Sequence, residues 1–180
     1  MTDGEEGRWA SIVILVGNPQ PGSRTRRVAE SVAAALAQRS GAQVPETIEL
    51  ADIADELFRH PSAAVDAVRE RVLAADVLIV ASPTYKATYT GLLKAFLDRF
   101  DAGALHAVTA VPLLTFGSLA HALAVEVSLR PLLVELGASV PTRGIAFPAS
   151  QVDQRDETVA AWADAEWSRL RPALTGSRPL

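Results

Sequence analysis

Three short polar segments hold the residue types in this sequence that could bind a nucleotide. The first, residues 17–25, includes Asn18, Ser23, Arg24 and Thr25 and lies between an apolar run and a helical pattern. Hydroxyls, guanidinium groups and the free N–H groups of a helix N-terminus all bind phosphate. The segment therefore predicts an anion site. The alternative is an ordinary capped turn in which Ser23 or Thr25 is the N-cap.

The first turn of the helix that follows is unusual, because it holds Arg24, Arg26 and Arg27 and no acidic residue precedes Glu30. Positive charge at a helix N-terminus opposes the macrodipole by about 0.3–1 kcal/mol for each residue. A bound phosphate would reverse the sign of that cost. The segment has neither the Gly-x-Gly-x-x-Gly spacing of dinucleotide folds nor the Gly-Lys-Ser/Thr ending of a P-loop, so a mononucleotide fits it better.

The composition of the chain, 180 residues with 49% hydrophobic and 21% charged, is that of one globular domain spanning residues 1–180. We expect residues 1–9 and 175–180 to be frayed, since they show no periodicity. A net charge of −4 gives no basic surface for nucleic acid.

The absence of cysteine excludes a disulfide, a thiol nucleophile and a Cys-ligated metal, and the three histidines are scattered, so we expect no metal site. The N-terminus is acidic and the apolar run behind it has only five residues, Ile12 to Val16. We therefore expect no signal peptide, no membrane association and a cytoplasmic protein.

Apolar strands alternate with helical patterns along the chain, which is typical of an α/β fold with a parallel sheet. Pro45 favours an edge position for the second strand, because proline lacks an N–H group for the sheet. Pro112 lies in the fourth expected strand and is unusual there, since a central strand rarely tolerates proline. The expected strands are residues 12–16, 43–50, 77–81, 107–114 and 144–147. The expected helical segments are one ending at Gly41, then 52–58, 61–75, 90–100, 119–136 and 153–170.

This pattern predicts a flavodoxin-like, doubly wound, five-stranded parallel sheet in the order 2-1-3-4-5, with helices on both faces. Ligands of such folds bind outside the carboxyl ends of the strands, where the strand order reverses. The loops 17–25, 82–90 and 115–118 should meet there.

The same segments resemble the NAD(P)H-dependent FMN reductases of flavodoxin-like fold, above all those that supply reduced FMN to alkanesulfonate monooxygenases. The likeness is carried by residues 17–25, 81–94 and 115–121 and extends over about residues 11–152. It implies FMN and NADPH as cofactors, with NADH not excluded. It also implies hydride transfer from nicotinamide C4 to flavin N5, for which the protein needs no catalytic side chain.

The resemblance assigns cofactor-binding residues by match to the family motifs. Ser23, Arg24 and Thr25, with Asn18 in the same loop, would hold the FMN phosphate. The loop with Pro83, Thr84, Tyr85 and Lys86 would lie along the isoalloxazine edge, and Thr115, Gly117 and Ser118 would face the pyrimidine side. The sequence departs from the family at Gln20, usually Arg, at Phe116, usually a small residue, and at Val127, an aromatic residue in the most similar relatives.

Two alternatives share the fold. One is a quinone, azo or metal-ion reductase that retains its FMN, and the other is a flavodoxin-type electron carrier. The carrier is disfavoured because Arg24, Arg26, Arg27 and Lys86 would crowd the site, whereas carriers usually show an acidic face there. His121 is either a proton donor or a residue packed against a loop. Asp98 and Glu126 are interpreted as helix-surface or interface residues.

The expected helix 119–136 has apolar residues around its whole circumference. The sheet can cover only one face, so a second subunit should cover the rest, which predicts a homodimer or homotetramer. Pro131 should kink this helix or loosen its hydrogen bonding near Val127.

Overall fold

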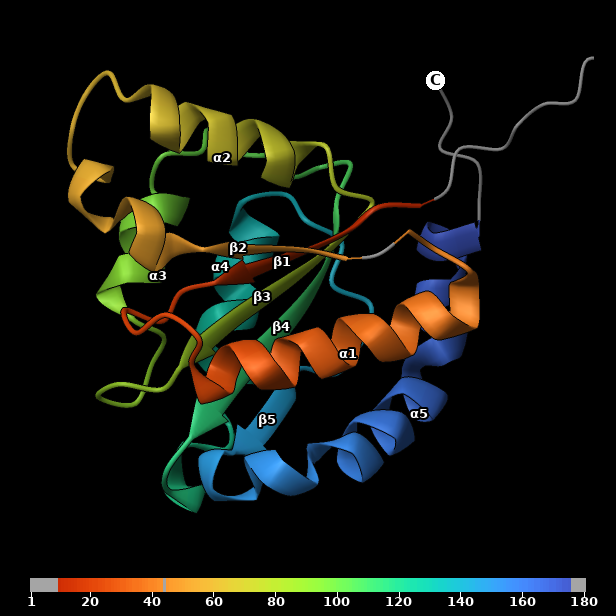
Figure 1. Cartoon of the computed structure of the whole chain (residues 1–180). Coiled ribbons are helices and arrows are strands. Elements are labelled where there is room, and N and C mark those ends of the chain that lie inside the picture. Colours follow the sequence, from red (N-terminus) through yellow and green to blue (C-terminus); the bar gives the residue numbers. More distant parts are fainter. Residues whose placement is uncertain (1–9, 44, 176–180) are drawn as a thin grey trace, which may run out of the picture.

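The fold is built on a five-stranded parallel sheet in the order β2-β1-β3-β4-β5, seen in a computed structural model of the chain (Figure 1). The strands are β1 Ile12–Val16, β2 Glu46–Glu49, β3 Val77–Pro83, β4 Thr109–Phe116 and β5 Ile145–Pro148. The predicted flavodoxin-like fold and its strand order are confirmed.

The structure describes residues 10–43 and 45–175. The expectation of frayed ends therefore lies outside the described residues, except at Thr175. Thr175 is the last residue of the last helix.

The helices lie on both faces of the sheet (Figure 1). Helices α1 and α5 pack side by side on one face, and α2, α3 and α4 cover the other. The α-helices are α1 Arg24–Ser40, α2 Ala63–Leu73, α3 Gly91–Leu97, α4 Arg130–Glu135 and α5 Arg155–Thr175. The described residues also form three 3₁₀ segments and one π segment. The 3₁₀ segments are η1 Leu50–Glu56, η2 Leu119–His121 and η4 Ala149–Gln154, and the π segment is η3 Val125–Leu129.

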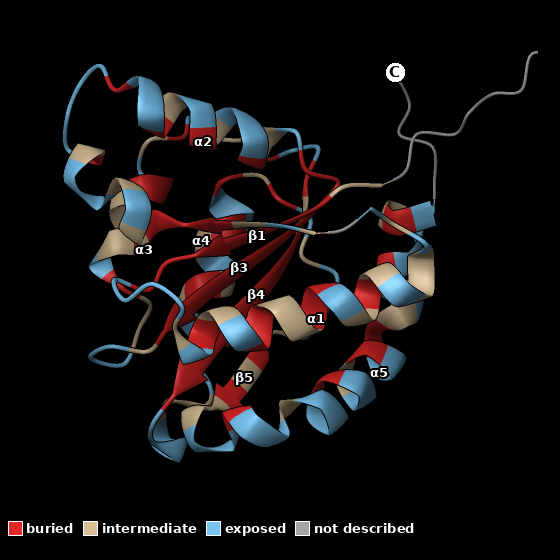
Figure 2. Ribbon diagram, in the orientation of Figure 1, coloured by how far each residue is buried: buried red, intermediate tan, exposed pale blue. Residues whose placement is uncertain are grey.

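The strand β3 shows how the two layers share the core (Figure 2). Val77, Ile79 and Ala81 pack toward α1 and α5, while Leu78 and Val80 pack toward α2, α3 and α4. Successive side chains of a strand point to opposite faces. A strand covered on both faces is therefore apolar throughout, as the unbroken run in the sequence indicated.

Pro112 lies inside β4 without costing the sheet a hydrogen bond. Ala110 N donates to Ser139 O on the β5 side, so the nitrogen of Pro112, two residues later, faces the same side. Pairing with β5 begins only opposite Leu113. The strand therefore tolerates a residue that lacks an N–H group.

The continuous helix predicted for residues 119–136 is wrong. The chain forms η2, then η3, then α4, with Pro131 in the first turn of α4. Proline removes a hydrogen bond and crowds the carbonyl of the preceding turn. The π segment Val125–Leu129 directly before it confirms that the helix loosens near Val127.

Candidate functional site

The three polar segments meet at the carboxyl ends of the strands, as predicted, and enclose a cavity of about 190 Å³. Of the eleven predicted cofactor-binding residues, all except Lys86 and Ser118 line it. The walls consist of Asn18, Gln20, Ser23, Arg24, Thr25, Pro83, Thr84, Tyr85, Thr115, Phe116, Gly117 and Ala149.

The two predicted residues outside the cavity have other places. Lys86 lines a neighbouring, more open hollow of about 860 Å³ together with Thr84, Tyr85, Ala87 and His121. The Ser118 hydroxyl accepts a hydrogen bond from Ala120 N and caps η2. The hollow and the cavity share Thr84 and Tyr85, so two ligands could meet across these residues.

The start of the first loop is held very close to α3. Gly17 N donates to Ala81 O at 2.7 Å, and Thr90 Oγ1 donates to Gly17 O at 2.5 Å. A Cβ atom on Gly17 would lie 2.6 Å from Leu93 Cβ. Only glycine allows this approach, because a larger residue would have to displace the helix.

Asn18 stabilises the conformation of the first loop. Its Oδ1 accepts from Gln20 N at 2.9 Å, and its Nδ2 donates to Thr25 Oγ1 at 3.4 Å. The first bond is the turn that asparagine side chains commonly form with their own backbone two residues on. Both polar ends of this buried side chain are used, so its contribution to the site is to hold the loop.

Thr25 and Thr115 join the first loop to the third across the floor of the cavity. Their hydroxyl oxygens lie 2.7 Å apart, and either one can be the donor. Two hydroxyls bring two hydrogens, and the bond between them uses one. Within residues 10–43 and 45–175 no acceptor takes the other, so one hydroxyl hydrogen is left for a ligand.

Thr84 provides a second free polar group. Its backbone N–H donates to Thr115 O at 2.7 Å, whereas its Oγ1 is buried and has no hydrogen-bond partner in the described part of the chain. A buried hydroxyl without a partner is costly, and a bound ligand would remove that cost. The cavity therefore offers a polar ligand this free hydroxyl and the spare hydroxyl hydrogen of Thr25 and Thr115.

The second loop ends in a tight and strained turn. Tyr85 and Thr88 exchange backbone hydrogen bonds of 2.8 and 3.3 Å. Between them Lys86 and Ala87 have φ values of +51° and +69°. Residues other than glycine rarely adopt this region, and strained turns of this kind gather at functional sites. The turn presents the ring of Tyr85, which is 48% exposed, at the border of the cavity and the hollow.

The three arginines of the first helical turn do not all face the cavity, contrary to the expectation. Arg24 lines it and donates to Ala149 O at 3.3 Å. Arg27 pairs with Asp153 at 3.4 Å, and Arg26 pairs with Glu30 and Glu49. The hydrogen bonds that Arg26 donates to Glu30, and then to Glu49, raise the pKa of Arg26. Carboxylates of this chain therefore offset most of the charge that was assigned to a ligand.

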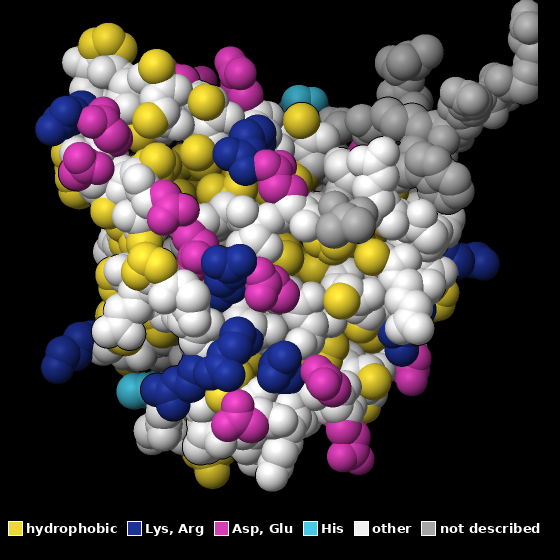
Figure 3. Space-filling model, in the orientation of Figure 1, with side chains coloured by type: hydrophobic (Ala, Val, Ile, Leu, Met, Phe, Trp, Pro, Cys, Tyr) yellow, Lys and Arg dark blue, Asp and Glu magenta, His cyan; other side chains and the backbone are white. Residues whose placement is uncertain are grey.

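The surface shows the same mixture of charges. Lys and Arg side chains form a band over the N-terminal end of α1, with Asp and Glu side chains beside them (Figure 3). Positive charge at the site is therefore less concentrated than the sequence indicated, and gives less reason to exclude an electron carrier.

Two acidic residues lie where the sequence suggested, on helix surfaces. Asp98 pairs with Lys94 one turn earlier on α3. Glu126, in η3, accepts from Gly144 N at 2.6 Å and pairs with Arg130, whose hydrogen bond is the main reason that the pKa of Glu126 is lowered. Glu126 thus ties the broken helix to the segment that leads into β5.

Sequence reasoning missed Ala149 and Glu49. Ala149 contributes its carbonyl oxygen to Arg24 and lies in η4, where no local pattern marks a site. Glu49 closes β2 and binds the outer side of the first loop. The only sequence signal for Glu49 was an acid at the carboxyl end of a strand, and that position points to the loop edge.

The described residues contain no group of three or more His, Asp or Glu side chains placed to hold a metal ion. Among the helices within 10–43 and 45–175, none combines the length and the apolar character that crossing a membrane requires.

Comparison with known proteins identifies a family and several relatives that this chain resembles. The model of a family described as NADPH-dependent FMN reductase matches residues 10–152. An FMN reductase (NADPH) of Escherichia coli (strain K12) is 43% identical over 94 residues, which cover 52% of this chain and 49% of that protein. The NADH-dependent FMN reductase SfnE of Pseudomonas putida is 34% identical over 175 residues, 94% of this chain and 91% of that one.

A solved structure agrees with these matches. The apo form of an NADH:FMN oxidoreductase (EMOB) superposes with a TM-score of 0.83 at 35% identity, and the match covers 95% of both chains.

Proposed function

Because the chain belongs to the NADPH-dependent FMN reductase family, we propose that it is an NAD(P)H:FMN oxidoreductase whose active site is the cavity between residues 17–25, 82–90 and 115–118. The observation that carries the proposal is the set of free polar groups in one cavity. They are the buried Thr84 Oγ1 and the spare hydroxyl hydrogen of Thr25 and Thr115. Both lie among the residues expected to bind FMN.

The phosphate of FMN would bind at the start of α1. Ser23 Oγ accepts from Arg26 N at 3.2 Å, which leaves its hydrogen for a phosphate oxygen. The guanidinium group of Arg24 adds a charged donor at the cavity wall. Arg24 and Thr25 are the first two residues of α1, where backbone N–H groups lack helical partners. These groups make the helix N-terminus the anion-binding end of the site.

The ring system would lie between the second and third loops. Pro83, Thr84, Tyr85 and Lys86 would follow the isoalloxazine edge, and Thr115, Gly117 and Ser118 would face the pyrimidine side. Bound FMN would supply the redox chemistry, accepting hydride at N5 from nicotinamide C4. The task of the protein is to hold two rings face to face and to exclude water.

The open hollow beside Tyr85 is the place for the nicotinamide nucleotide. It adjoins the cavity at Thr84 and Tyr85, and Lys86 and His121 lie on its wall. We propose NADPH as the hydride donor, because the matching family is described as NADPH-dependent. NADH is not excluded, because relatives named for NADPH and for NADH both match this chain.

Reduced FMN would then leave for a flavin-dependent monooxygenase, and the cytoplasmic location expected from the sequence belongs to this proposal. The protein would work as a homodimer or homotetramer. Leu119, Leu123, Val127 and Val134 all expose their apolar side chains, and Val127 is 70% exposed. An apolar face of this kind is typical of a subunit interface.

Phe116, which stands where the resemblance implies a small residue, is buried at the end of β4 and lines the cavity.

The test is to follow NADPH and NADH oxidation by the purified protein with and without added FMN. We expect oxidation that depends on FMN and releases reduced FMN to solution. Binding of FMN without oxidation of either nucleotide would indicate an electron carrier. Activity that needs no added FMN and reduces quinones or azo dyes instead would indicate an FMN-retaining reductase.

A further inference from the structure

A buried carboxylate lies directly behind the phosphate loop. Glu49 is the last residue of β2 and pairs in register with Val16, the last residue of β1, from which the loop departs. Glu49 is only 8% exposed. Burying a carboxylate is costly unless it has hydrogen bonds and an opposite charge beside it.

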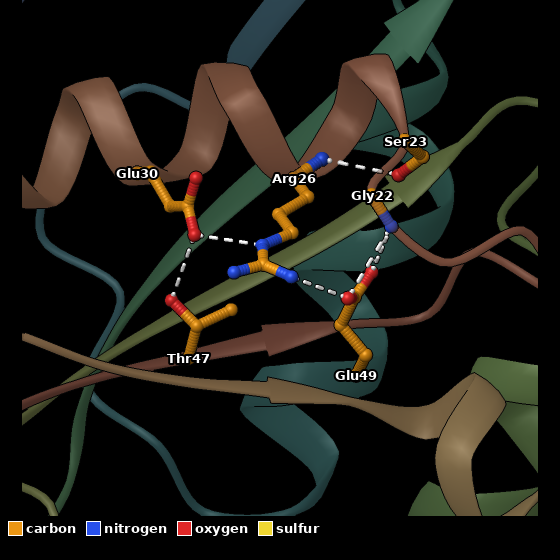
Figure 4. Close-up of polar contacts among 6 residues, drawn as sticks. All are labelled: Gly22, Ser23, Arg26, Glu30, Thr47 and Glu49. Carbon is orange, nitrogen blue, oxygen red and sulfur yellow. Dashed lines mark hydrogen bonds and ion pairs between the residues drawn. The ribbon is translucent and has the colours of Figure 1, made fainter.

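Both requirements are met by the loop and by the helix that follows it. Gly22 N donates to Glu49 Oε1 at 3.0 Å and to Oε2 at 3.3 Å. The guanidinium group of Arg26 donates to Glu49 Oε2 at 2.6 Å. The carboxylate thus holds one backbone group of the loop and one side chain of the first turn of α1 at the same time (Figure 4).

The contacts continue along the edge of the sheet. Arg26 Nε donates to Glu30 Oε1 at 2.7 Å, and Thr47 Oγ1 donates to the same oxygen at 3.3 Å. Figure 4 shows Glu30 and Glu49 on either side of the Arg26 guanidinium group. Gly22, Arg26 and Glu49 are not among the residues that line the cavity. The network therefore supports the loop from outside the cavity.

Gly22 is the part of the loop that most needs support. Its φ is +64°, and apart from Gly22 and its two chain neighbours no atom lies within 4 Å of the position that a Cβ would take. The hydrogen bonds to Glu49 therefore hold a residue whose side-chain position faces open space. The next residues, Ser23, Arg24 and Thr25, line the cavity, so the peptide at Gly22 sets the direction of their N–H groups.

We propose that Glu49 is a positioning residue for the FMN phosphate, acting through Gly22 and Arg26 and never touching the ligand. This inference rests on the proposed function, because it assumes that the phosphate binds at residues 23–25. The positioning role explains why Glu49 lies near the proposed anion site, although its negative charge alone would disfavour a phosphate there.

Charge and position predict opposite outcomes when Glu49 is replaced. Loss of a nearby negative charge alone would tighten the binding of a phosphate. Loss of the acceptor for Gly22 N–H would loosen the loop and weaken binding. The direction of the change in affinity therefore decides between the two effects.

The experiment measures the dissociation constants of FMN and riboflavin for wild-type protein, Glu49→Ala and Glu49→Gln by flavin fluorescence. For Glu49→Ala we expect the Kd for FMN to rise about tenfold, a typical result of losing a hydrogen bond to a charged group. The Kd for riboflavin, which has no phosphate, should change less than about twofold. Glu49→Gln keeps one oxygen for Gly22 and should lie between wild type and Glu49→Ala.

The matched control is Glu46→Ala. Glu46 is at the other end of the same strand and pairs with an arginine as well, Arg71, but lies outside the cavity wall. It should leave both flavin affinities unchanged. If Glu49→Ala does not fold, Glu49→Gln decides alone, since a weaker affinity for FMN supports positioning and an equal or tighter one overturns it.

Two results separate this inference from the proposed function. Equal losses for FMN and riboflavin in both Glu49 variants would overturn the positioning role while leaving the flavin site intact. A wild-type protein that binds riboflavin as tightly as FMN would remove the phosphate site, and with it both proposals.

Discussion

The connections that follow β1 and β4 have the two most unusual local sequences of the chain. The unusual side chains of the first are paired in the fold, whereas those of the second remain exposed. The first places three arginines at a helix N-terminus, and the second places a proline in an apolar run. Within the described residues, the charges of Arg26 and Arg27 are met by Glu30, Glu49 and Asp153. The apolar side chains of the second connection, among them Leu123 and Val127, stay on the surface.

The difference follows from what each kind of side chain needs: a charge needs one partner, whereas an apolar surface needs a covering area. One carboxylate within hydrogen-bond distance satisfies a guanidinium group, so a few side chains can compensate the first anomaly. Apolar surface is covered only by a comparable area, at about 25 cal/mol per Å² buried. No element within residues 10–43 and 45–175 covers these side chains. The charges of the first connection are thus paired within one chain, whereas the second is the face at which we propose that another subunit binds.

The largest effect should come from a charge placed in the second connection. Val127→Arg should convert an oligomer into a monomer, because an unpaired buried charge costs about 3–5 kcal/mol and a two-fold axis applies that cost twice. Size-exclusion chromatography with light scattering measures the mass. The matched control is Phe58→Arg, which alters an exposed apolar residue elsewhere and should leave the mass unchanged. A wild-type monomer at micromolar concentration would remove this face from any interface.

The next effect concerns the first connection. Ser23→Ala combined with Arg24→Ala should weaken FMN binding by about 3 kcal/mol or more, since each charged hydrogen bond contributes about 1.5–3 kcal/mol. The affinity for riboflavin should hardly change. Arg27→Ala is the matched control, because Arg27 sits in the same helical turn but pairs with Asp153 outside the cavity. Equal losses for both flavins would contradict the phosphate assignment.

A smaller effect is expected where the second connection is tied to β5. Glu126→Gln should lower the free energy of unfolding by about 1 kcal/mol at pH 7, a modest figure because the Glu126 side chain is partly exposed. The folded-state pKa of Glu126 is lowered from 4.5. Its contribution is therefore present above pH 4.5 and is lost as the pH falls through the folded-state value. Urea titrations at several pH values measure the difference.

The control for that series is Asp98→Asn, which removes an exposed pair on α3 and should change stability less. A difference between wild type and Glu126→Gln that persists unchanged well below pH 4.5 would show that the carboxylate is not its source.

The smallest effect is expected at His121. His121→Ala should keep kcat for NADPH oxidation at saturating FMN within about threefold of wild type, because flavin chemistry needs no protein acid to accept hydride. Loss of about a thousandfold with FMN still bound would identify His121 as a general acid. Since His121 lines the open hollow, a change in KM for the nucleotide alone would agree with a binding role.

The sequence by itself was sufficient for the sheet and for the ends of several helices. The unbroken apolar run of β3 predicted a strand covered on both faces. Helix α1 ends at the C-cap Gly41 as expected, and its N-cap is Ser23, one of the two residues that the sequence offered for that position. Caps, glycine turns and apolar periods are local signals, since they involve residues a few positions apart. Strand order then brought the three polar loops to one edge of the sheet.

What only the tertiary structure decided is how distant side chains are paired. Glu49 reaches Gly22, Arg27 reaches Asp153 and Thr25 reaches Thr115, over separations of 27, 126 and 90 residues. Such pairs depend on the register of strands and the rotation of helices, and one residue of shift would turn each side chain away. The residues able to bind a phosphate could therefore be named from the sequence, whereas the residues that hold them in place could not.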